Sequence, residues 1–144
     1  MSSDDLIILF SEEFEKLKKL LDQMNPDNEL TVNQIVQVYY QITNVSSLTE
    51  VIKQQLDDSD STSFEKISNA QNFISENFNS NIHPKIMKNI ANSVSEITKN
   101  LQSLNSDEKS KETIENEAKL YEKLREFMST KEFVMQYNAG LSND

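Results

Sequence analysis

The residues most able to do chemistry are few. The chain has one histidine, His83, and no cysteine. A carboxylate-bridged di-metal bundle needs Glu-x-x-His on each of two helices, and zinc sites depend on several His and Cys ligands. A serine-type triad would have His83 as its only possible base. His83 also directly precedes Pro84, a residue type favoured at the first position of a helix. We therefore expect a loop or N-cap histidine rather than a catalytic or metal-binding one.

Carboxylates are the second source of possible chemistry. Paired acids occur at Glu12-Glu13, at Asp57-Asp58, and at Glu115 and Glu117. Glycoside hydrolysis would need two carboxyl groups across a cleft, with shifted pKa values. These acids fall on predicted outer helix faces or in a polar linker, so we interpret them as solvating groups. The linker also lacks the glycine and the ligand spacing of an EF-hand.

Glycine is almost absent, which limits both chemistry and fold. The only glycine is Gly140, so no glycine-rich loop can hold a phosphate group. We therefore predict no enzyme activity, no metal and no cofactor. Sheet-rich folds need many tight turns that contain Gly or Pro, whereas this chain has one Gly and two Pro in 144 residues. We predict an all-α fold, an antiparallel helical bundle of four main helices with one or two short ones.

Apolar residues at steps of three and four predict where these helices lie. We expect a single domain over residues 1–144, with a polar linker near 57–63. The expected helices cover about 4–24, 31–56, 62–78, 84–104 and 111–137, and a strand over 32–43 is the alternative for the second. The expected inner residues of the first helix are Leu6, Phe10, Phe14, Leu17, Leu21 and Met24. Those of the second helix are Ile35, Val38, Ile42 and Val45, with Val32, Val36 and Tyr39 beside them. For the fifth helix they are Ile114, Ala118, Tyr121, Leu124 and Met128.

Local signals predict where the helices begin and end. Thr31 and Gln34 fit a capping box, in which each side chain satisfies the backbone N–H of the other residue. The same pattern at Ser47 predicts a break or kink before a short helix, and at Ser129 it predicts a break followed by a short last helix. We further expect one helix to end over residues 77–81, a turn near 104–110, and a left-handed cap at Gly140.

The charge balance excludes several kinds of partner. The chain has 24 acids and 14 bases, a net charge of -10. Nucleic-acid binding and attachment to anionic membranes both depend on basic side chains, so we expect neither. The apolar run at residues 6–10 is too short to span a bilayer, and two acids precede it where a signal peptide needs bases. We expect no integral membrane segment and a cytoplasmic location.

Two apolar features remain as interface candidates. Residues 30–49 contain no charge but include Val36, Tyr39 and Tyr40, and tyrosine is common at protein interfaces. This helix could equally be the core of its own bundle. The second feature is the first helix, where Ile7, Ile8 and Leu9 make the opening turns apolar on every side, so that its own bundle or a partner must cover them.

These observations predict an interaction or assembly module rather than a catalyst. The expected partner is a protein, with self-association to a homodimer through the uncharged helix as the first hypothesis. An acidic regulator that occupies a basic site on another protein is the alternative. A helical coat on a lipid or polymer surface is a further alternative.

Overall fold

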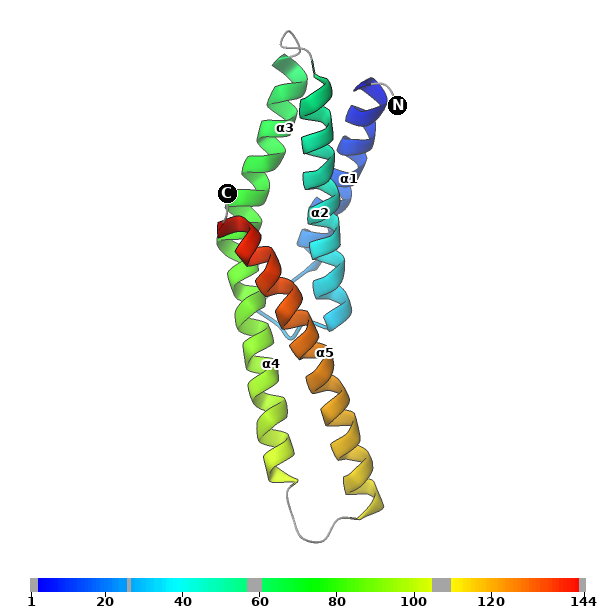
Figure 1. Cartoon of the computed structure of the whole chain (residues 1–144), viewed down its shortest axis with the longest axis vertical. Coiled ribbons are helices and arrows are strands. Elements are labelled where there is room, and N and C mark those ends of the chain that lie inside the picture. Colours follow the sequence, from blue (N-terminus) through cyan, green and yellow to red (C-terminus); the bar gives the residue numbers. More distant parts are fainter. Residues whose placement is uncertain (1–2, 26, 57–60, 105–109, 143–144) are drawn as a thin grey trace. The chain divides into compact units, whose positions relative to one another are not determined.

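The computed structural model is all-α, which confirms the predicted fold class (Figure 1). It describes residues 3–25, 27–56, 61–104 and 110–142. The helices are α1 (Ser3–Gln23), α2 (Val32–Gln55), α3 (Ser61–Phe73), the π-helix η1 (Ile74–Ile82), α4 (His83–Ser103) and α5 (Lys111–Ser142). The chain divides into two compact units, Met1–Pro84 and Lys85–Asp144. The prediction of a single domain stays a prediction, because compact units need not fold separately.

In the first unit, α1, α2 and α3 run in alternating directions, and α2 contacts both of the others (Figure 1). The predicted inner faces of α1 and α2 are confirmed. Buried apolar side chains recur mainly at steps of three, four or seven residues, as one face of a helix requires. They are Leu6, Phe10, Leu17 and Leu21 in α1, and Ile35, Val38, Tyr39, Ile42, Val45 and Ile52 in α2. The aromatic ring of Phe14 adds an edge contact to Phe73 of α3, at 5.4 Å between centroids.

Helix α2 starts as predicted but does not break. Thr31 adopts an extended backbone, and its side chain and that of Gln34 form the reciprocal capping box. The break expected at Ser47 is wrong, because α2 continues to Gln55. Its buried face continues through Val45, Thr49 and Ile52, and this burial keeps the helix intact across the second Ser-x-x-Glu pattern.

The end predicted over residues 77–81 is also wrong, because α3, η1 and α4 follow one another without a non-helical residue. In η1 the backbone bonds span five residues, as in the bond from the His83 N–H to the Phe78 carbonyl. The Ser80 hydroxyl also donates to the Ser75 carbonyl, at 2.9 Å. The wider turn places His83, five residues after Phe78, on the same buried face. The wider turn of η1 also comes shortly before Pro84, whose backbone nitrogen has no N–H to donate in a regular helical hydrogen bond.

The second unit consists of α4 and α5, which run antiparallel to each other (Figure 1). Ile86, Ile90 and Ile97 are buried on α4, as are Phe127 and Val134 on α5. The break predicted at Ser129 and the cap predicted at Gly140 are both wrong, because α5 continues to Ser142 and Gly140 has no positive φ. The predicted linker at 57–63 lies partly outside the described residues, and its last three residues are helical. Most of the predicted turn at 104–110 lies outside them as well.

Candidate functional site

The six predicted interface residues have different surroundings. Tyr40 is 62% exposed and Ile8 is 58% exposed, whereas Tyr39 is fully buried. Ile7, Leu9 and Val36 are half-buried. Within the chain, then, the opening turns of α1 are not covered on every side. Of the two tyrosines, only Tyr40 offers a side chain to a partner.

Tyr40 lies on an outward face of α2 that carries no charge. We call this the Tyr40 face, and its members are Asn33, Val36, Gln37, Tyr40, Thr43, Asn44 and Ser47. All are exposed except Val36, which is half-buried. Residues 1–84 hold 14 acids and 5 bases, so this uncharged face lies on a strongly acidic unit. Amide, hydroxyl and phenol groups can both donate and accept hydrogen bonds without the desolvation cost of a charge.

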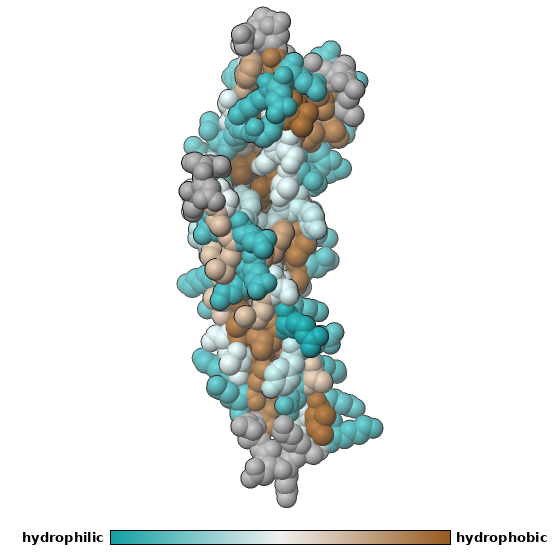
Figure 2. Space-filling view, in the orientation of Figure 1, coloured by the Kyte–Doolittle hydropathy of each residue, from teal (hydrophilic) through white to brown (hydrophobic). Residues whose placement is uncertain are grey.

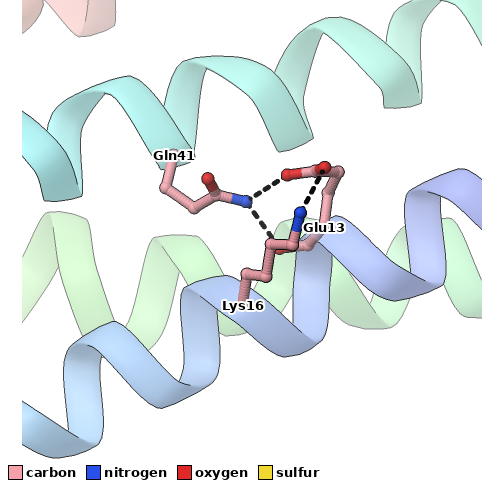
Figure 3. Close-up of polar contacts among 3 residues, drawn as sticks. All are labelled: Glu13, Lys16 and Gln41. Carbon is pink, nitrogen blue, oxygen red and sulfur yellow. Dashed lines mark hydrogen bonds and ion pairs between the residues drawn. The ribbon is translucent and has the colours of Figure 1, made fainter.

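A polar contact between α1 and α2 fixes how α2 presents this face (Figure 3). The Gln41 amide Nε2 donates to the Glu13 carbonyl at 2.8 Å and to the Glu13 carboxylate at 2.6 Å. Lys16 Nζ lies 3.2 Å from the same carboxylate. The hydrogen bond from Gln41 lowers the pKa of Glu13, and the hydrogen bond and charge of Lys16 lower it further. Because Gln41 is hydrogen-bonded to α1, the side chain of the adjacent residue Tyr40 points outward.

Tyr39 instead belongs to a buried polar contact. Its hydroxyl lies 2.5 Å from His83 Nδ1, and the Phe78 ring packs edge-on against Tyr39 at 5.3 Å. His83 is only 2% exposed. The prediction of a loop or N-cap histidine is therefore wrong, because His83 is a core residue inside a continuous helix. In this conformation its ring is hydrogen-bonded and closed off from any substrate.

Sequence reasoning missed an apolar surface on α5. Ile114, Tyr121 and Met128 were expected to face the core, but they are 55%, 51% and 45% exposed. Met135, the next residue in the same seven-residue step, is 52% exposed. Of the predicted inner residues only Leu124 is half-buried, and Ala118 is exposed as well. The inner face consists of Leu120, Leu124, Phe127 and Val134, which are buried or half-buried. Spacing gives no signal that distinguishes this row, because Leu120, Phe127 and Val134 of the inner face also follow steps of seven.

Two cavities lie among the described residues of the second unit, one open and one small. One of about 400 Å³ lies between the end of α4 and the start of α5, and Lys119 and Lys123 contribute to its wall. Every residue that lines it is exposed or half-buried. Elsewhere, a space of about 50 Å³ separates Met87 and Ile90 of α4 from Val134 and Met135 of α5. Neither cavity presents a buried polar side chain that would orient a ligand.

In the part of the chain that the structure describes, no three His, Asp or Glu side chains are placed to hold a metal ion. None of the helices over residues 3–25, 27–56, 61–104 and 110–142 combines the length and the apolar character needed to cross a bilayer. Comparisons of the chain with protein-family models, with curated proteins and with solved structures find no match.

Proposed function

We propose that this chain is a non-enzymatic interaction module that self-associates through the Tyr40 face of α2. The observation that carries the proposal is an exposed helix face without charges on a unit that holds 14 acids and 5 bases. A helix that faces only water normally carries charges on its outer side. Exposed tyrosine is instead typical of protein interfaces.

The acidic charge of the unit favours a second copy at this face. Two copies repel each other wherever their carboxylates approach, and this cost is lowest where neither surface is charged. In a two-fold symmetric pair the same patch contacts itself, so its groups must be able to pair with their own kind. Asn, Gln, Ser, Thr and Tyr side chains meet this condition because each can donate and accept.

The test is a single charge at Tyr40. Tyr40→Asp places a carboxylate in the centre of the face and should lower the mass of the assembly in light scattering, with an unchanged helical circular dichroism spectrum. Tyr39 is not a suitable target, because it is buried and its substitution would disturb the core. Ser46→Asp is the matched control, since Ser46 is exposed on α2 but outside the Tyr40 face. An assembly mass that Tyr40→Asp leaves unchanged contradicts the proposal.

A second candidate function is an acidic regulator that occupies a basic site on another protein. The concentration of charge on residues 1–84 favours it, because such asymmetry steers association with a basic partner. Binding of this kind weakens with ionic strength, whereas contact through an uncharged face does not. A partner recovered from the native host that stays bound as salt is raised contradicts this second candidate.

As part of the same proposal we place the protein in the cytoplasm, which imaging of a tagged chain would test.

A further inference from the structure

The outward side of α5 carries four apolar residues at steps of seven. We call Ile114, Tyr121, Met128 and Met135 the heptad stripe, and each is about half exposed, between 45% and 55%. A step of seven residues returns to nearly the same side of a helix, with a drift of about 20°. The four side chains therefore form one row along α5. Apolar side chains are visible among the polar surface in the space-filling view (Figure 2).

Apart from Met135, this row is separate from the face that α5 uses inside its own unit. The inner face contains Phe127 and Val134, and both Val134 and Met135 line a small space beside Met87 and Ile90 of α4. Helix α5 therefore has two apolar faces, of which one is occupied within the unit. A row of this kind can lie along a second helix, although it has one apolar residue in each seven where a coiled-coil seam has two.

We propose that the heptad stripe binds α5 of a second copy in antiparallel orientation. The charges beside the stripe support this occupant. Arg125 and Glu132 are seven residues apart on the same flank of the stripe, and in an antiparallel pair identical flanks face each other. If Met128 meets Met128 of the second copy at the two-fold axis, Arg125 lies near Glu132 of that copy. The two-fold axis produces a second, equivalent pair between Glu132 and Arg125 of the second copy.

The overall charge of the second unit points to the same occupant. Residues 85–144 contain 10 acids and 9 bases, so two copies of this unit repel each other little. Neither Arg125 nor Glu132 forms an ion pair with another described residue of its own chain, which leaves both available to a partner. Opposite charges beside an apolar seam also select orientation and partner in coiled coils.

This contact is independent of the Tyr40 face, because it uses another helix in another unit. A chain with two self-complementary surfaces can join a different copy through each. The wild-type protein should therefore form assemblies larger than a dimer. Loss of either surface alone should leave a dimer.

The first test uses the absence of cysteine, which makes any introduced thiol unique in the chain. Met128→Cys should give an interchain disulfide on mild oxidation, since the two thiols meet at the axis. Tyr121→Cys should give little disulfide, because in this register Tyr121 faces Met135 of the second copy. Glu126→Cys is the control, exposed on α5 but away from the stripe. Equal disulfide yields from Met128→Cys and Glu126→Cys overturn the proposal, and a high yield from Tyr121→Cys overturns the antiparallel orientation.

The second test separates this contact from the Tyr40 face by light scattering on Tyr40→Asp, Tyr121→Asp and the double variant. Each single variant should be a dimer, and the double variant should be a helical monomer. A monomeric Tyr40→Asp variant overturns the α5 contact while the Tyr40 face stands. A monomeric Tyr121→Asp variant supports the α5 contact and removes the proposed role of the Tyr40 face.

Discussion

The hydroxyl of Tyr39 and Nδ1 of His83 form a hydrogen bond inside the core, between α2 and the end of η1. Replacement of Tyr39 by Phe keeps the ring but deprives the buried His83 of this partner. Loss of a partner for a buried polar group costs about 1–3 kcal/mol. We expect Tyr39→Phe to lower the free energy of unfolding by this amount, measured by urea denaturation.

The neighbouring residue provides the control for that experiment. Tyr40 is 62% exposed, so Tyr40→Phe should change the free energy of unfolding by no more than about 0.5 kcal/mol. Similar losses of stability for the two variants would show that the buried contact with His83 contributes nothing specific.

The contact between Gln41 and Glu13 predicts a dependence of stability on pH. Because hydrogen bonds from Gln41 and Lys16 lower the pKa of Glu13 in the folded protein, folding favours the charged carboxylate. The stabilising effect is complete above the ordinary pKa of 4.5 and is lost as the pH falls through the lowered value. In Gln41→Ala the pKa of Glu13 should rise toward its ordinary value, which a carboxyl NMR titration would measure.

A pKa of Glu13 that Gln41→Ala leaves unchanged would contradict the assignment of this hydrogen bond as the main cause.

Truncation to alanine should change the free energy of unfolding by different amounts at two residues in the opening turns of α1. Leu6 is buried and Ile8 is 58% exposed. Leu6→Ala should lower the free energy of unfolding by about 2 kcal/mol or more, through lost burial and the cavity left behind. Ile8→Ala should change it by less than about 0.5 kcal/mol. Denaturation curves with equal losses would show that Ile8 is covered in the folded protein, as an intimate partner contact would require.

Gly140 distinguishes the observed helix from the predicted cap. It is helical, has no positive φ, and a Cβ at this position would meet nothing within 4 Å. Alanine is therefore compatible with the backbone, and Gly140→Ala should raise the thermal midpoint, with a gain of up to about 1 kcal/mol. A left-handed cap would give the opposite sign, since alanine is strained there.

The sequence predicted the fold class and the buried faces of the first two helices because burial there follows a plain spacing of three and four. It predicted the start of α2 because the residues before Thr31 are not helical, so the Thr31 side chain caps a helix N-terminus. The identical pattern at Ser47 lies within a continuous buried stripe, and tertiary burial outweighs a local cap. In the same way, the wide turn of η1 brings His83 into the core, and the local preference of proline for helix starts does not predict this.

The candidate surfaces were predicted less completely. Tyr39 and Tyr40 are adjacent in sequence, but adjacent helical residues point about 100° apart, and only the packing of α1 against α2 decides which is buried. On α5, two apolar rows of similar composition compete for the inner face. Composition alone does not predict which row is buried, because that depends on how α4 packs against α5.

The central claim is that the protein acts through association of its own copies. Light scattering of the wild-type chain over a wide range of concentrations tests it most directly. The account predicts a mass above the 16.6 kDa of one chain that rises with concentration beyond that of a dimer. A mass of 16.6 kDa at every concentration would contradict it.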